Sequence, residues 1–295
     1  MNELSMSESS AAMPPEVNAG MNNLKRLARR KTVLIGFAVF FAIVLASICA
    51  PLLTSYSPYK LSIVNRLQPP GAHLFGTDGF GRDVFARTIY AGRLSLLVGI
   101  SVVIASSLMG VTLGLLAGFF KRLDGLLSRF VDAMMSFPDI LLAVAVVAAL
   151  GPSVWAVIIA LGIVYAPRMA RIVRASTLVI SELPYVEAAR ALGVPTHTIM
   201  MRHILRNLIS PILVQATFIF ASAMLAETGL SFLGLGVDPS IPTWGTMLSE
   251  GRQYIGSADW LTLFPGITLV LAVLSLQLIG DGFRDLMDPR LKKDM

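Results

Sequence analysis

The chain has few charged residues and almost no cysteine. Only 14% of its 295 residues are charged, whereas an ordinary soluble domain carries about 25%. A soluble protein of this length needs more charge on its surface, so a cytosolic enzyme, a secreted globular domain and a disordered chain are nearly excluded. The single cysteine, Cys49, lies within an apolar run and excludes an internal disulfide or a cysteine-based metal site.

Hydrophobic residues are abundant instead. They make up 55% of the chain, and the mean hydropathy is +0.72. They form long unbroken runs rather than the short alternating segments of a membrane β-barrel. Because only helices and closed barrels satisfy backbone polar groups in lipid, the sequence predicts an all-α protein that crosses the membrane several times.

A membrane-spanning helix needs about 20 apolar residues. The Gly151-Pro152 turn signal divides the long stretch 133–167 into two spans. The first run contains 21 residues, which is long for the apolar part of a cleaved signal peptide, so we interpret it as a true span. We therefore expect six transmembrane helices, in the runs 33–53, 94–120, 131–150, 153–171, 208–235 and 261–280.

These spans divide the chain into segments. The first 24 residues are rich in Ser, Asn, Pro and Met, and they predict a disordered tail. If this tail is cytoplasmic, only six of the 24 Lys and Arg residues lie on the outer side, which favours both termini inside. We expect the following divisions: tail 1–24, first transmembrane helix 25–54, extracytoplasmic loop 55–93, five-helix core 94–283 with an inner loop at about 172–207, and cytoplasmic C-terminal tail 284–295.

The inner loop contains a predicted elbow of two short helices. Pro184 suits the first turn of a helix, and the residues after it are good helix formers. Gly193 fits a left-handed stop, and Pro195 opens a second helix that runs to about Arg206. The apolar residues Val186, Ala189 and Leu192 lie on one side of this elbow and predict docking into a groove of a partner protein. The alternative is an interfacial helix that rests on lipid headgroups.

The motif Glu187-Ala188-Ala189-x-x-x-Gly193 resembles the EAA loop in the permease subunits of bacterial ABC importers. Leu205 also matches the family pattern, whereas His203 and Arg206 stand where that pattern has Ile and Pro. The resemblance implies that this loop docks into an ATPase subunit. Further strings are similar to the second, C-type permease of dipeptide, oligopeptide and nickel importers; they are 73–78, 81–84, 92–96, 227–236 and 242–245.

The resemblance implies a type I ABC importer permease fold and a place in the bacterial inner membrane. It implies half of a translocation path for di- or oligopeptides, with nickel, glutathione or another small peptide-like cargo as the alternative. The implied partners are a homologous second permease subunit, two ATP-binding subunits and an extracytoplasmic substrate-binding protein. No G-x-x-x-x-G-K-[ST] motif occurs, so we expect no ATPase site, no other enzyme activity and no cofactor.

Two other classes of function are a secondary transporter and an intramembrane enzyme. A secondary transporter would carry inverted repeats, and the sequence shows no convincing repeat. An intramembrane enzyme would need a catalytic motif, but neither H-E-x-x-H nor G-x-S-x-G is present. Both are weaker interpretations than the permease.

Charged residues within the spans are candidate path or hinge residues. Pro138 can kink its span, and Asp139 would lie about 12 Å along a helix that begins near residue 131. The alternative for Asp139 is an interhelical hydrogen bond. Glu227 either lines the path, caps a helix break or pairs with an arginine. In the outer loop we expect an Asp78–Arg82 ion pair. The three histidines lie on opposite sides of the membrane, so we expect no metal site.

Overall fold

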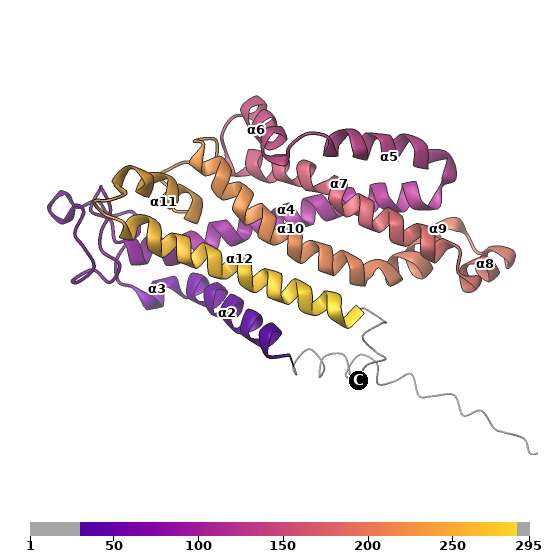
Figure 1. Cartoon of the computed structure of the whole chain (residues 1–295), viewed down its shortest axis with the longest axis horizontal. Helices are drawn as coiled ribbons and strands as arrows, with labels where there is room; N and C mark the ends of the chain where they lie inside the picture. The colour runs from indigo at the N-terminus through magenta and orange to yellow at the C-terminus, as the bar shows by residue number, and fades with distance from the viewer. Residues whose placement is uncertain (1–29, 288–295) are drawn as a thin grey trace, which may run out of the picture.

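The computed structural model describes residues 30–287, and the fold of this part is helical. Its only β-type pairing is an isolated bridge between Thr77 and Asp83. Five helices are long and apolar enough to cross a membrane, and a bent pair could supply a sixth crossing. These helices lie side by side in one elongated bundle (Figure 1). The predicted all-α membrane fold is therefore confirmed.

The membrane-crossing helices keep the order predicted from the sequence, with different ends. The fifth crossing is a continuous helical stretch, Thr196–Phe232, which comprises a short α9, a π-helical turn and α10. The helices are α2 (Lys31–Ile48), α4 (Val84–Phe119), the bent pair α5 (Lys121–Met135) and α6 (Asp139–Leu150), α7 (Val154–Ser181), α9 (Thr196–Thr198), η3 (Ile199–Leu205), α10 (Arg206–Phe232) and α12 (Trp260–Met287).

Helix α4 begins at Val84, so the last ten residues of the expected outer loop, 84–93, are helical. Asp83 starts the helix, because its side chain accepts a hydrogen bond from the Ala86 backbone N–H at 2.7 Å. Arg87 and Arg93 made this first part look too polar for a span. Arg93 donates to the backbone oxygen of Ser47 at 2.7 Å, and Arg87 is buried among charged partners.

The third span is broken rather than straight. Helices α5 and α6 meet at an angle of 91° around Pro138, whose extended backbone ends one helix before the next begins. Asp139 is consequently the first residue of α6, and the expectation that it lies about 12 Å along a helix from residue 131 is wrong. Gly151, with φ of +83°, makes the predicted turn into α7. Helix α7 then continues to Ser181, so the first ten residues of the expected inner loop 172–207 are helical.

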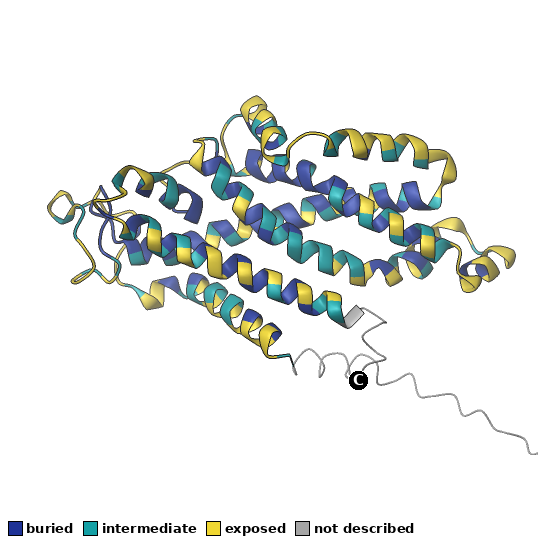
Figure 2. Cartoon of the chain, viewed as in Figure 1, coloured by how far each residue is buried: buried dark blue, intermediate teal, exposed yellow. Residues whose placement is uncertain are grey.

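The centre of the bundle is the contact between α4 and α7. Gly110, Gly114 and Gly118 repeat every four residues and bring the two backbones close together. A Cβ atom on Gly114 would lie only 2.6 Å from the backbone oxygen of Ala170. Small residues at this spacing are a common means of close helix packing in membranes. Buried residues accordingly concentrate along α4 and α7 (Figure 2).

The opposite ends of the bundle differ in structure. One end carries the short helices α3 (Ala50–Leu53), η2 (Ile63–Asn65), α11 (Trp244–Gly251) and η4 (Arg252–Tyr254), together with the folded loop between α3 and α4. The other end carries α8 (Pro184–Ala191) and α9 (Figure 1). Arg30 pairs with Asp285, so the start of α2 and the end of α12 lie together. The expected tail 1–24 and most of the expected tail 284–295 lie outside the described residues.

Candidate functional site

The elbow between α7 and α10 is a short helix closed by a left-handed glycine. Pro184 occupies the first turn of α8, as expected. Gly193 has φ of +75°, which confirms the predicted stop. The Gly193 N–H donates to the Arg190 oxygen, and the Val194 N–H donates to the Ala189 oxygen, both at 3.0 Å. These two bonds form a Schellman motif, which fixes the direction in which the chain leaves the helix.

The inner face of α8 packs on the start of the fifth membrane crossing. Val186 is fully buried and Ala189 is 8% exposed, and both belong to the main core cluster with Ile199 and Ile204. Leu205, the last residue of the matched motif, is half-buried against the same cluster. The backing is apolar, so α8 is held as part of the bundle and is not a free loop.

The outer face of α8 is exposed and carries most of the motif. Glu187, Ala188 and Gly193 are all exposed, and α8 lies at one tip of the bundle (Figure 1). The sequence pattern grouped Leu192 with Val186 and Ala189 on one docking side of the elbow, but Leu192 is 84% exposed, whereas the other two are buried against this chain's own helices. That grouping is wrong because the helix ends at Ala191 and the Schellman turn redirects the next residue. The result is a small-residue surface with one projecting leucine.

Polar contacts fasten α8 to its neighbours. The Asn207 side-chain amide donates to the Tyr185 hydroxyl at 3.0 Å and to the His203 backbone oxygen at 2.7 Å. On the other side, the Arg190 guanidinium lies 5.0 Å above the ring of Phe119 at the end of α4. Helix α8 thus contacts both α4 and α10.

The second arm of the elbow does not stop at Arg206. It passes through η3, a π-helical segment, directly into α10 without an intervening turn. Wider π-helical turns inside α-helices are frequent at functional sites. The expected separate helix Thr196–Arg206 is therefore the first part of the fifth membrane crossing.

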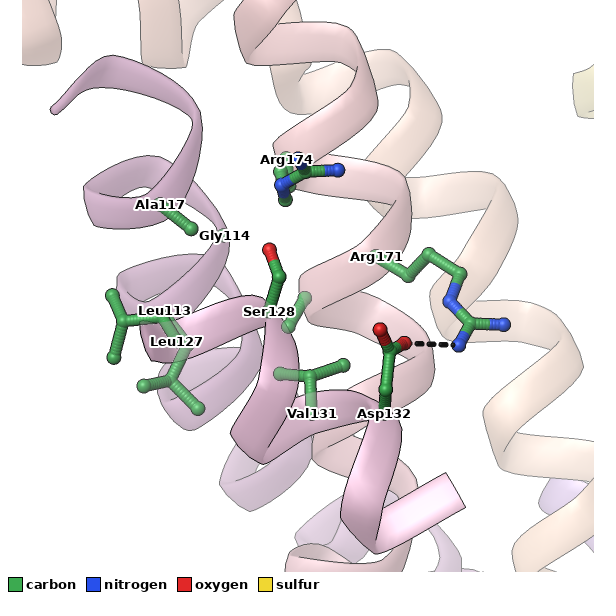
Figure 3. Close-up of a pocket in the computed structure, with 10 residues that line it drawn as sticks. Leu113, Gly114, Ala117, Leu127, Ser128, Val131, Asp132, Arg171 and Arg174 are labelled. Carbon is green, nitrogen blue, oxygen red and sulfur yellow. Dashed lines mark hydrogen bonds and ion pairs between the residues drawn. The ribbon is translucent and has the colours of Figure 1, made fainter. Parts of the chain in front are cut away.

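Three arginines on α7 pair with three aspartates on α5 and α6. The arginines occur every third residue and meet the aspartates in reverse chain order. Arg171 donates to Asp132 at 2.8 Å, and Arg174 donates to Asp124 at 2.8 Å. Figure 3 shows the Asp132–Arg171 pair beside a small cavity of about 50 Å³ between α4, α5 and α7. The third pair, Arg168–Asp139, lies at the bend between α5 and α6.

Asp139 therefore has the interhelical partner that the sequence allowed as an alternative. With Arg168 it lines an open pocket of about 380 Å³ between α6, α7 and α10. Pro138 lies at the bend, as a hinge position would, although it does not line this pocket.

Glu227 occupies a different environment. It is 1% exposed and accepts hydrogen bonds from Ser231 at 2.9 Å and from Thr243 at 3.1 Å. Thr243 caps α11 through a capping box, so the Glu227 carboxylate lies beside the positive end of that helix. Of the three expectations for Glu227, these contacts favour a capping role, and no arginine pairs with it among the described residues.

A second charged cluster lies at the opposite end from α8. Arg82 donates to Asp78 at 2.6 Å, which confirms the expected pair, and donates to Glu250 on α11 at 2.7 Å. Arg87 lies 3.2 Å from the same Glu250 carboxylate. Burial raises the pKa of Glu250 above its ordinary value, and the two arginines oppose that rise. Among residues 30–287, no group of three His, Cys, Asp or Glu side chains is placed to hold a metal ion.

Some of these positions carry a signal in the sequence that was not among the predictions above. The four-residue spacing of the glycines at 110, 114 and 118 inside an apolar run indicates close helix packing. The arginines at 168, 171 and 174 share a helix face by their three-residue spacing. Glu250 has no local signal, because its partners lie more than 160 residues earlier in the chain.

This geometry defines a multi-pass membrane protein with a packed helical elbow at one end and a folded cap at the other. Residues 110–293 match the family described as the inner membrane component of binding-protein-dependent transport systems. Residues 22–70 match the N-terminal transmembrane domain of oligopeptide transport permease C. The chain belongs to this family of inner-membrane transport components.

Several relatives cover nearly the whole chain. A putative peptide transport system permease protein of Brucella suis biovar 1 is 49% identical over 91% of both chains. The dipeptide transport system permease protein DppC of Alkalihalophilus pseudofirmus is 46% identical over 95% of this chain and 94% of its own. The glutathione transport system permease protein GsiD of Pectobacterium atrosepticum is 39% identical over 89% of each.

A solved structure shares the fold. An inward-facing conformation of the MetNI methionine ABC transporter superposes with a TM-score of 0.57 at 20% identity. The match covers 68% of this chain and 97% of the other. The expected permease fold is confirmed by this likeness together with the family match.

Proposed function

We propose that this chain is the permease subunit of an ABC importer and forms half of the translocation path for di- or oligopeptides. The names of its relatives support a peptide cargo, and their similarity extends over about nine-tenths of the chain. The proposed partners are a homologous second permease, two ATP-binding subunits and an extracytoplasmic binding protein. ATP hydrolysis occurs on the ATP-binding subunits, and this chain has no catalytic role.

The observation that carries the proposal is the construction of α8. Its inner face is buried through Val186 and Ala189, whereas its outer face presents Glu187, Ala188 and Leu192 to a partner. A rigid knob between two membrane-crossing helices is suited to pass movement from a docked subunit to the membrane. In this proposal the α8 end and both termini face the cytoplasm, where ATP is available.

Site-directed cross-linking tests the docking. In a Cys49→Ala background, Leu192→Cys in the assembled transporter should cross-link to an ATP-binding subunit. A matched variant, Ile63→Cys, carries an equally exposed residue at the opposite end, where Ile63 is 85% exposed. It should give no such product. A transporter in which Leu192→Cys reaches no ATP-binding subunit contradicts the proposed coupling role.

Uptake by the reconstituted complex tests the cargo. Proteoliposomes that contain both permeases, the ATP-binding subunits and the loaded binding protein should accumulate a labelled dipeptide only when ATP is supplied. Glutathione is the second cargo to compare, because one relative is named as a glutathione permease. Uptake that proceeds without ATP would contradict the whole proposal.

A further inference from the structure

The pocket between α6, α7 and α10 combines opposite charges with an apolar wall. Its polar lining is Asp139, Tyr165, Arg168 and Ser222, and its apolar lining includes Ile140 and Leu225. The volume of about 380 Å³ lies within the usual range of small-molecule sites. The pocket is open on one side, so a molecule can reach it without unfolding a helix.

The position of Arg168 along α7 makes the charges of this pocket informative. Arg168 lies 14 residues after Val154 and 13 residues before Ser181, which places it about 20 Å from either end of α7. The Arg168 and Asp139 side chains are still 40% and 37% exposed. Charged groups that remain exposed within a membrane-spanning helix are costly against lipid. The open side therefore faces water or another protein chain, as the wall of a path between two permeases would.

The side chains of Arg168 and Asp139 are held in position, and each keeps hydrogen-bonding groups that the pair does not occupy. Arg168 pairs with Asp139 through one of its terminal nitrogens, and its guanidinium lies 5.3 Å from the centre of the Tyr165 ring. The Tyr165 hydroxyl donates to the backbone oxygen of Ser222 at 3.2 Å, which fixes that ring. A guanidinium has five N–H donors and a carboxylate accepts about four hydrogen bonds, so both groups can bind a ligand as well.

Resting on the function proposed above, we propose that this pocket is a binding station for the charged ends of a peptide in transit. Arg168 binds the terminal carboxylate and Asp139 binds the terminal ammonium, while Ile140 and Leu225 contact the side chains. A short peptide carries both charges a few ångströms apart, which matches a site built on one ion pair. Without cargo the two residues pair with each other, and the arriving peptide replaces each partner.

A neighbouring pair provides a matched control. Arg171 and Asp132 join α7 to α5, the other half of the bent pair, about one turn further along α7, and lie outside this pocket. If the Arg168–Asp139 pair only held α6 against α7, substitution of either pair would have similar consequences. If Arg168 and Asp139 bind the peptide, only their substitution changes transport.

The test uses the complete transporter in proteoliposomes, with dialanine at a concentration that saturates the binding protein. Arg168→Gln and Asp139→Asn should each lower the maximal uptake rate at least about tenfold. ATP hydrolysis stimulated by the loaded binding protein should persist, so the ATP consumed per peptide rises by a similar factor. Arg171→Gln should leave both rates unchanged. Unchanged uptake in either pocket variant overturns the inference.

Two further variants separate binding from structure. The exchange Asp139→Arg with Arg168→Asp keeps an ion pair but reverses its direction, and it should not restore uptake. Recovery in that variant overturns the inference, because it shows that only the pairing matters. Leu225→Trp should fill the pocket and block uptake, whereas Leu213→Trp, equally exposed at 49% on the same helix, should not.

The outcomes also distinguish the two proposals. Wild-type proteoliposomes that show no ATP-dependent dipeptide uptake contradict the proposed function itself. If the wild type takes up dipeptide and Leu225→Trp does so at the same rate, only the binding station is contradicted. Assembly of each variant is checked by co-purification of the subunits.

Discussion

The Tyr185 hydroxyl on α8 accepts a hydrogen bond at 3.0 Å from the Asn207 amide on α10, and so joins the exposed elbow to a membrane helix. Tyr185→Phe removes this bond and keeps the ring. We expect the free energy that holds α8 against α10 to fall by about 1 kcal/mol. This is equivalent to a roughly fivefold weaker coupling of ATP hydrolysis to uptake. Tyr56→Phe, which removes a hydroxyl at the opposite end of the bundle, should leave the ratio of ATP to peptide unchanged. Equal ratios in the two variants would show that this bond does not transmit force.

Gly193 is required for its backbone conformation. A Cβ atom at this position would meet nothing within 4 Å, so a substitution acts only through its φ of +75°. Gly193→Val should distort the Schellman turn and lower uptake at least about tenfold, because valine strongly disfavours this region. Gly193→Asn should retain most uptake, since asparagine tolerates it.

Gly234 offers a control for the strain itself. It has φ of +78° and equally open surroundings, but it lies at the end of the bundle opposite α8. Gly234→Val should therefore leave the coupling of ATP hydrolysis to uptake intact. Membrane insertion of all three variants is followed by immunoblotting, and full uptake by Gly193→Val would contradict the coupling role.

The contact between α4 and α7 permits no added atom at Gly114. A new Cβ would lie 2.6 Å from the Ala170 oxygen and 2.7 Å from the Val173 Cβ. We expect Gly114→Ala to lower the free energy of unfolding by about 1–3 kcal/mol, although alanine is the better helix former. Gly125→Ala on α5, where nothing lies within 4 Å, should be neutral or stabilising. Thermal unfolding in detergent measures both, and equal stability of the two variants would contradict the close packing.

Glu250 neutralises two arginines at the end of the bundle opposite α8. Glu250→Ala leaves Arg87, which is 1% exposed, without its closest acidic partner. We expect a destabilisation of about 3 kcal/mol, because breaking a buried ion pair strands the remaining charge. Asp238→Ala removes an exposed carboxylate nearby in sequence and should cost far less. Similar melting temperatures for the two variants would show that the cluster contributes little.

Local chemistry explains which features could be predicted from the sequence. Apolar runs that are long enough to cross a bilayer as a helix predict membrane spans. Glycines beside helix ends predict the turns at Gly151 and Gly193. Each of these depends on residues close together in the chain. The Asp78–Arg82 pair was also within reach because only four residues separate its members.

Features that depend on distant contacts could not be predicted. Arg87 and Arg93 lower the mean hydropathy at the start of α4, so the sequence does not indicate a span there. Only the folded chain shows which groups neutralise these two arginines. The right angle between α5 and α6 has the same origin. Pro138 signals a break, but the angle is set by packing of α6 against α7 and by the paired charges of the two segments.

The unbroken helical stretch from Thr196 to Phe232 contains 37 residues and is about 55 Å long. It begins under the exposed elbow and ends close to Glu227 and the cap of α11. A rod of this length works as a lever, since a tilt of about 5° shifts one tip by about 5 Å relative to the other. If α8 docks a partner as proposed, a modest push there would displace the far end of this helix, beside Glu227, by about the width of a peptide backbone.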